Sequence, residues 1–234
     1  MKILTWNCNG AFRKKHHLLK DFDADILIIQ ECEDPKLSTN AFKNWATNYL
    51  WSGNNKNKGI GIFAKEQYDI KKLDWKDNNL EQFLPCRIND RFNLLGVWTK
   101  YANSPNFNYI GQFWKYMKIN QSHMQSDNIL ICGDFNSNSC WDQWDRWWNH
   151  TDVVSNLKKI NVESIYHRYY SEKQGNESRP TLFHRKKSDS NYHVDYIFSS
   201  ASLFDSKQNI LKVGKVDDWL KSSDHMPILC TINI

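Results

Sequence analysis

The segment Ile129-Leu130-Ile131-Cys132-Gly133-Asp134-Phe135-Asn136 sets the expectation for both the fold and the site. Its four leading apolar residues predict a buried strand that stops at a glycine. Side chains of a strand alternate between its two faces, so Asp134 and Asn136 point the same way. An Asp-x-Asn sequence after a strand is also common in turns and helix caps. The segment alone therefore predicts a strand end and does not decide a function.

The same arrangement recurs along the chain, where four further apolar runs begin or end at polar residues. Such runs predict strands, and strand ends that meet at one edge of a sheet bring their side chains together. We therefore expect a single polar site at the rim of a sheet, shared with Asp134 and Asn136. The polar residues at these other ends are Asn7, Gln30, Glu31, His193, Asp195, Ser223, Asp224 and His225.

The chain has 234 residues and a formal net charge of +5, a mildly basic balance that suits a polyanionic partner without establishing one. No internal repeat and no Pro/Gly/Ser-rich linker divides it, so we expect one domain over residues 1–234. Its six cysteines show no metal-ligand spacing, and no signal peptide or membrane span is visible. These features favour a reducing, cytoplasmic location.

The pattern of apolar runs predicts an α/β fold with mixed sheets and helices packed outside. Helices are expected over Arg13–Phe22, Asn106–Ser122 and Asp152–Lys159. The short loop after Ile60–Ala64 predicts antiparallel pairing with Tyr68–Leu73. Strands are expected over Lys2–Asn7, Ile26–Gln30, Ile60–Ala64, Phe92–Thr99, Asn128–Cys132, Val194–Ser199 and Pro227–Ile232, with weaker candidates at Asn48–Ser52, Tyr68–Leu73, Gln82–Ile88 and Ile210–Val213.

Four of the eleven tryptophans, spaced by three and four residues, lie in one short segment. This spacing predicts one face of a helix, and we interpret that face as packing against the core rather than as a stacking surface for nucleobases. The residues are Trp141, Trp144, Trp147 and Trp148.

The residue types at the polar ends indicate metal-assisted attack of water on a phosphoester. Glu31 and Asp224, with the neutral oxygen of Asn7, suit Mg²⁺ or Mn²⁺ better than zinc. Asp134 can take a proton from water, and Asn136 can orient that water. His225 would stabilise phosphoryl charge if Asp195 fixed its tautomer. The chain has no GxxxxGK[ST] loop, no GxGxxG loop and no nucleophile elbow, which disfavours nucleotide hydrolysis of the P-loop type and serine hydrolase chemistry.

Taken together and in order, five motifs resemble those of the endonuclease/exonuclease/phosphatase (DNase I-like) superfamily. The resemblance implies a four-layer α/β sandwich, with two mixed sheets face to face and helices outside. It also implies that Glu31 is the main metal ligand with Asn7 and Asp224 nearby, and that Asp134, Asn136, Asp195 and His225 are catalytic. The motifs are Thr5-Trp6-Asn7-Cys8-Asn9-Gly10, Ile29-Gln30-Glu31, Gly133-Asp134-Phe135-Asn136-Ser137, His193-Val194-Asp195-Tyr196-Ile197 and Ser223-Asp224-His225-Met226-Pro227.

One segment departs from the superfamily pattern. Nucleases that this chain resembles carry a Tyr or His in the loop after the strand expected at Phe92–Thr99. The corresponding residues 100–106 offer only Tyr101 for that role. We therefore include Tyr101 among the candidate nucleic-acid contacts.

The preferred substrate is a nucleic acid, with DNA favoured over RNA. A basic, aromatic segment at residues 179–187 is expected to form a hairpin before Asp195, and Arg179, Arg185, Lys186 and Lys187 could contact phosphates without reading sequence. A phosphatase or phosphodiesterase of inositol phosphates or phospholipids would use the same catalytic residues. An inactive binding module is disfavoured because the full polar set is present. We expect no stable membrane association, and no protein partner is implied.

Overall fold

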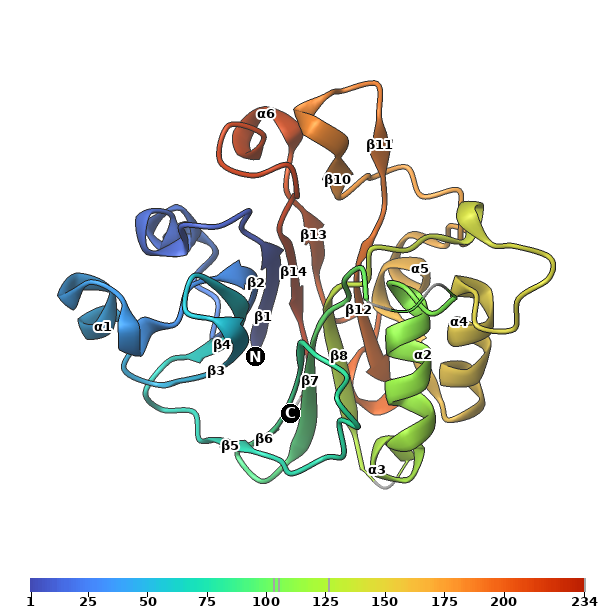
Figure 1. Ribbon diagram of the computed structural model, residues 1–234, viewed down its shortest axis with the longest axis horizontal. Coiled ribbons are helices and arrows are strands. Elements are labelled where there is room, and N and C mark those ends of the chain that lie inside the picture. The colour runs from blue at the N-terminus through green and yellow to red at the C-terminus, as the bar shows by residue number, and fades with distance from the viewer. Residues whose placement is uncertain (103, 105, 126, 234) are drawn as a thin grey trace.

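Two six-stranded mixed β-sheets pack face to face in the computed structural model, and helices cover the outer side of each sheet (Figure 1). The structure describes residues 1–102, 104, 106–125 and 127–233. The predicted α/β sandwich with two mixed sheets is thus confirmed. In spatial order, the first sheet consists of β13 (Leu211–Val213), β14 (Ile228–Thr231), β1 (Lys2–Asn7), β2 (Ile26–Cys32), β4 (Lys58–Ala64) and β3 (Tyr49–Asn55).

The second sheet has the same number of strands and is also mixed. Within it β7 and β8 run parallel, as β1 and β2 do in the first sheet, while the other neighbours are antiparallel. Its strands, in spatial order, are β5 (Ile70–Lys72), β6 (Phe83–Ile88), β7 (Phe92–Trp98), β8 (Ile129–Asp134), β12 (Asp195–Ser200) and β9 (Val162–Ser164).

The helices are short, and a separate two-stranded hairpin joins β10 (Leu182–Phe183) to β11 (Asn191–Tyr192). The α-helices are α1 (Asn40–Trp45), α2 (Ile110–Ile119), α3 (Gln121–Gln125), α4 (His150–Lys159), α5 (Ile165–Tyr170) and α6 (Val216–Trp219). The 3-10 helices are η1 (Phe12–Lys14), η2 (His16–Phe22), η3 (Pro35–Leu37), η4 (Ser139–Trp141), η5 (His184–Lys186) and η6 (Ala201–Leu203).

Three apolar clusters hold the four layers together. Side chains such as Ile28, Ile62 and Leu94 fill the space between the two sheets and are fully buried. Each such side chain contributes about 1.5–3 kcal/mol of burial free energy. A second cluster packs α2, α3 and α4 on the outer face of the second sheet, and a third packs η1, η2, α1 and α6 on the first. Among the described residues, none of the helices has the length and apolar content needed to span a bilayer.

Two predictions about local structure are wrong. The segment predicted as one α-helix forms two 3-10 helices, over residues 12–14 and 16–22, because Phe12 and Leu19 are the only buried residues of these two helices and no apolar stripe forms. Strand β4 does not pair with β5. Both edges of β4 are already taken by β2 and β3, so the chain crosses to the other sheet and β5 pairs with β6.

The tryptophan segment also differs from its prediction. Only Trp148 is buried, whereas Trp144 is 98% exposed and Trp147 64% exposed. The Asn149 side chain hydrogen-bonds the backbone of Gln143 and Arg146, and this folds the segment into a loop where a helix was expected. The interpretation of these rings as a packing face is therefore wrong for Trp144 and Trp147, while Trp141, 40% exposed, packs on one side against Tyr192.

The expected helix over Asn106–Ser122 is shorter than predicted. Helix α2 starts after Tyr109, whose φ is +49°, and ends at Ile119, with Asn120 as its C-cap. The Asn120 side chain donates to the carbonyl groups of Tyr116 and Lys76, and a separate helix α3 follows.

Replacement of Gly133 by alanine should destabilise the fold. The φ of Gly133 is +149°, and a Cβ there would lie 1.8 Å from the carbonyl oxygen of Val97 on the neighbouring strand β7. Backbone strain and overpacking together predict a loss of about 2 to 4 kcal/mol in the free energy of unfolding, measured by urea titration. The control Gly10→Ala also has a positive φ, +74°, but its Cβ would meet no atom within 4 Å. Equal losses in the two variants would show that the contact with Val97 does not matter.

Candidate active site

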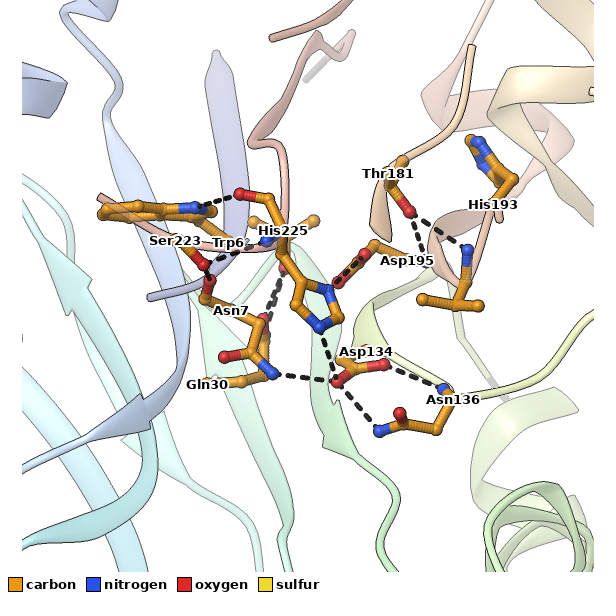
Figure 2. A network of polar contacts seen from close by, with 12 residues as sticks. Trp6, Asn7, Gln30, Asp134, Asn136, Thr181, His193, Asp195, Ser223 and His225 are labelled. Carbon is orange, nitrogen blue, oxygen red and sulfur yellow. Dashed lines mark hydrogen bonds and ion pairs between the residues drawn. The ribbon is translucent and has the colours of Figure 1, made fainter. Parts of the chain in front are cut away.

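The polar ends of four strands meet at one rim of the sandwich (Figure 2). Strands β1 and β2 end there in the first sheet, and β8 ends beside the start of β12 in the second. The two sheets are joined by a hydrogen bond of 2.9 Å from Asn7 Nδ2 to Asp134 Oδ2. The expected common site therefore exists, although Asn7, Asp134, Asp195 and His225 are buried instead of lying exposed on the rim.

Asp134 is held by a set of hydrogen bonds that fixes both carboxylate oxygens. Asn136 donates its backbone N–H to Oδ1 at 2.8 Å and its side-chain Nδ2 to Oδ2 at 2.9 Å, in addition to the bond from Asn7. Burial raises the pKa of Asp134, the charge on His225 opposes this rise, and the outcome is a pKa of about 7. A carboxylate with that pKa is suited to accept a proton from water at neutral pH.

His225 lies between two carboxylates (Figure 2). Its Nδ1 is 2.8 Å from Asp195 Oδ2, and its Nε2 is 4.0 Å from Asp134 Oδ2. Burial alone would lower the pKa of His225, but Asp195 and then Asp134 outweigh it and raise the pKa to about 10. The imidazolium is therefore the stable form at neutral pH, with Asp195 fixing the ring as the sequence predicted and Nε2–H directed at the space beside Asp134.

Glu31 and Asn7 present hard oxygen donors next to this pair. Asn7 Nδ2 lies 3.5 Å from Glu31 Oε1, and the Asn7 Oδ1 accepts the backbone N–H of Asn9. Glu31 sits in a β-bulge of β2 with a φ of +62°, a strained conformation that turns its side chain toward the rim. The ammonium of Lys58 balances its charge, with Nζ at 2.7 Å from Oε2.

The donor chemistry around Glu31 fits Mg²⁺ or Mn²⁺. The Ser223 hydroxyl donates to the Asn7 carbonyl at 2.8 Å, which fixes the segment that carries Asp224 to the end of β1. In the described part of the chain, Asp134, Asp195 and His225 also have ligand atoms within 4.8 Å of one another. A protonated His225 cannot bind a cation, so Glu31 and Asn7 are the candidate ligands, although the Asn7 Oδ1 also accepts the Asn9 N–H.

A second layer of polar residues supports the site, and sequence analysis did not find it. The Thr181 hydroxyl accepts the backbone N–H groups of Val194 and Asp195, both at 3.0 Å. Asn138 donates to Glu177 Oε2 at 3.0 Å and to the His193 carbonyl at 2.9 Å. No local sequence signal marks Thr181 or Glu177, because their partners are distant along the chain.

The predicted nucleic-acid contacts are arranged around the β10–β11 hairpin. Leu182 forms a β-bridge with His225, and the Phe183 N–H donates to the Asp224 carbonyl at 2.8 Å, so the hairpin is fixed to the site. Its tip carries Arg185, Lys186 and Lys187, of which Lys186 Nζ donates to the Lys221 carbonyl.

Two other predicted contacts lie away from that tip. The Arg179 guanidinium pairs with Glu172 at 3.1 Å and stacks on Tyr170, with 3.8 Å to the ring centroid. Its contact with a phosphate remains a prediction. Tyr101 is 73% exposed, and its ring lies 6.4 Å from the ring of Tyr109. Of the segment 100–106, which contains Tyr101, residues 103 and 105 fall outside the described part.

The comparisons with known proteins agree with this geometry. A model of the Endonuclease/Exonuclease/phosphatase family matches residues 4–225. Among solved structures, a 3'-5' exonuclease from Neisseria meningitidis is 20% identical with a TM-score of 0.72, and an AP endonuclease from Archaeoglobus fulgidus is 19% identical with a TM-score of 0.71. A 3' phosphatase from Neisseria bound to a product DNA hairpin is 19% identical with a TM-score of 0.73. Each likeness covers 100% of both chains.

At these identities the likenesses show a shared fold, the DNase I-like sandwich. A comparison with curated proteins gives no significant match.

The buried carboxylate of Glu177 should make the stability of the protein depend on acid pH. Burial would raise its pKa, but hydrogen bonds from His167, Asn138 and the Gly175 N–H lower it to about 2. Its ordinary value is 4.5, so its contribution to stability is complete above pH 4.5 and is lost as the pH falls toward 2. Urea titrations at pH 6 and pH 3 should show a smaller loss on acidification in Glu177→Gln than in the wild type. The exposed Glu66→Gln serves as control, and a wild-type-like loss in Glu177→Gln would contradict this account.

Proposed function

The chain belongs to the Endonuclease/Exonuclease/phosphatase family, and we propose that it is a divalent-metal-dependent phosphodiesterase that hydrolyses nucleic acid, with DNA favoured over RNA. Family members are phosphoric ester hydrolases. The observation that carries the proposal is the buried group of Asp134, His225 and Asp195, with His225 Nδ1 bonded to Asp195 and its Nε2 facing Asp134. Such a group is costly to bury, and it is suited to moving one proton and stabilising one developing negative charge.

Each residue has a distinct part in the proposed reaction. Asp134 takes a proton from the attacking water, and its carboxylate is aimed by the bonds from Asn7 and Asn136. The water oxygen forms a bond to phosphorus while the ester oxygen leaves. His225 donates from Nε2 to a phosphoryl oxygen, and Asp195 keeps the ring charged and oriented. Tyr101 is the remaining candidate for contact with the phosphate or the leaving group.

Glu31 and Asn7, with Asp224 nearby, are the residues that would hold the cation. A divalent ion bound there would neutralise phosphate charge and polarise the phosphoryl oxygen. The bulge at Glu31 and the bond from Ser223 to the Asn7 carbonyl support this assignment, because both fix the backbone that carries these donors.

A nucleic-acid substrate is supported by the position of the basic hairpin. Arg185, Lys186 and Lys187 extend from a hairpin that is bridged to His225, so a phosphate backbone bound there would pass the site. The solved Neisseria 3' phosphatase with the same fold holds a product DNA hairpin.

A second candidate is a phospholipid or inositol phosphate phosphodiesterase. It is favoured by one observation, the exposed rings of Trp144 and Trp147 on the loop between β8 and α4. Exposed tryptophans of this kind are also found at membrane interfaces.

The first test is a gel assay of the purified protein with labelled single-stranded DNA, duplex DNA, duplex DNA with one abasic site, and RNA. We expect cleavage with Mg²⁺ or Mn²⁺, loss of cleavage in EDTA, and a fall of at least about 100-fold in Asp134→Asn, because the amide cannot accept the proton. If no nucleic acid is cleaved but phosphate or head group is released from lipid or inositol phosphates, the second candidate replaces the first.

Replacement of Glu31 by glutamine should raise the metal concentration needed for cleavage. The amide lacks the charge that attracts the cation, so we expect the half-saturating Mg²⁺ concentration to rise by about 10-fold or more. Lys58→Met removes the ammonium that pairs with Glu31, so it should lower the half-saturating Mg²⁺ concentration. Metal titrations of Glu31→Gln and wild type that overlay would exclude Glu31 as the ligand.

A further inference from the structure

The ammonium of Lys58 is bound to the carboxylate that the proposed cation would need. Its Nζ lies 2.7 Å from Glu31 Oε2, and 50% of the Lys58 side chain is exposed. The other carboxylate oxygen of Glu31, Oε1, lies 3.5 Å from Asn7 Nδ2. A cation on this carboxylate would stand beside the ammonium, and like charges so close together repel strongly. The binding of a cation to Glu31 therefore opposes the pairing of Glu31 with Lys58.

The backbone of Lys58 is fixed, so that its side chain can move while the strand stays in place. Lys58 opens β4 and pairs with Asn55 across the turn of the β3–β4 hairpin. The turn is tied to the segment after β2, because the Asp34 N–H donates to the Lys56 carbonyl at 2.8 Å. A lysine side chain carries its charge on a flexible four-carbon stem. The ammonium can therefore leave Glu31 without any movement of the hairpin.

The indole of Trp98 offers the ammonium a second position beside the proposed catalytic carboxylate. Lys58 Nζ is 5.8 Å from the centroid of the Trp98 ring, a distance at which an ammonium is attracted to an aromatic face. Trp98 ends β7 and pairs in register with Asp134 on β8. An ammonium released from Glu31 therefore stays near Asp134, where the proposed substrate brings its phosphates.

Three neighbouring basic side chains differ from Lys58 in the partners that hold them. These partners are backbone carbonyl groups or another carboxylate, and none of them is a proposed metal ligand. The three are Lys15, which donates to the Cys8 carbonyl at 2.6 Å, Lys186, which donates to the Lys221 carbonyl at 2.9 Å, and Lys100, which lies 3.6 Å from Glu81.

We propose that Lys58 is a phosphate-binding residue whose availability depends on a cation at Glu31. Lys58 leaves Glu31 when a divalent cation binds there, and its ammonium then pairs with a phosphate next to the scissile one. The proposal rests on the proposed function for the cation and for the nucleic acid. It implies that the cation and the nucleic acid each strengthen the binding of the other, beyond the direct attraction between them.

The test is a double-mutant cycle of duplex DNA binding in EDTA, measured by fluorescence anisotropy, so that it depends on neither cleavage nor metal. Glu31→Gln removes the charge that holds Lys58 and so frees the ammonium. In wild type, Lys58→Met should weaken binding by about twofold or less, because the ammonium is engaged with Glu31. In Glu31→Gln the same replacement should weaken binding by about 5- to 10-fold, because a phosphate contact is lost. There the slope of log K against log salt should also become less negative by about 0.9.

Lys100→Met is the matched control, because Lys100 also lies over the Trp98 ring, at 5.0 Å, but pairs with Glu81 instead of Glu31. It should weaken DNA binding by the same factor in wild type and in Glu31→Gln. Glu31→Ala also frees the ammonium and should reproduce Glu31→Gln. An equal cost of Lys58→Met in both backgrounds, or no DNA binding by wild type and Glu31→Gln, would overturn the proposal. Unequal costs without cleavage of any nucleic acid would instead refute the proposed function and leave the phosphate contact standing.

The competition with the cation is tested by isothermal titration calorimetry with Mn²⁺ and no nucleic acid. Lys58→Met should bind Mn²⁺ at least about fivefold more tightly than wild type, because no ammonium opposes the ion. Lys100→Met should bind Mn²⁺ as wild type does. Equal affinities of Lys58→Met and wild type would show that Lys58 does not give way to a cation and would overturn the proposal.

Discussion

The hydrogen bond between Asn7 and Asp134 is the contact on which the site depends, because it crosses from one sheet to the other. Neither sheet contains a complete set of polar residues, since Asn7 and Glu31 belong to the first and Asp134 and Asp195 to the second. The packing of the apolar faces between the sheets sets the position of β1 relative to β8 along the strand direction. A slip of one residue along a strand is about 3.3 Å, which would abolish a bond of this length. The inter-sheet core is therefore a determinant of catalytic geometry as well as of stability.

The burial of the catalytic group has an electrostatic consequence. Asp134 and Asp195 share a single cation, His225, so the buried group keeps a negative charge when both carboxylates are ionised. In the described part of the chain, Asp195 Oδ1 also lacks a hydrogen-bond partner. Such a group destabilises the folded protein relative to an apolar replacement of similar volume. It is expected to be retained for its chemistry, which needs a base and an acid at a fixed separation.

Sequence patterns were sufficient for most strands and for the polar residues at their ends, because both depend on local order, but they did not predict β9. Lys2–Asn7 and Ile26–Gln30 are apolar runs that end in polar residues, and the structure places those ends together. Features that depend on distant partners could not be found in this way. Strand β5 pairs with β6 because both edges of β4 are occupied. The exposure of Trp144 follows from the side-chain hydrogen bonds of Asn149. Glu177 supports the site through Asn138, which lies 39 positions away in the sequence.

Main-chain bonds connect the β10–β11 hairpin to the proposed catalytic residues. The Met226 N–H donates to the Thr181 carbonyl at 2.7 Å, and the Thr181 hydroxyl accepts the N–H of Asp195. Thr181 therefore bonds the backbone of Asp195 and of Met226, the residue that follows His225. The proposed phosphate contacts of Arg185 and Lys187 and the position of the imidazole therefore depend on one segment of the chain.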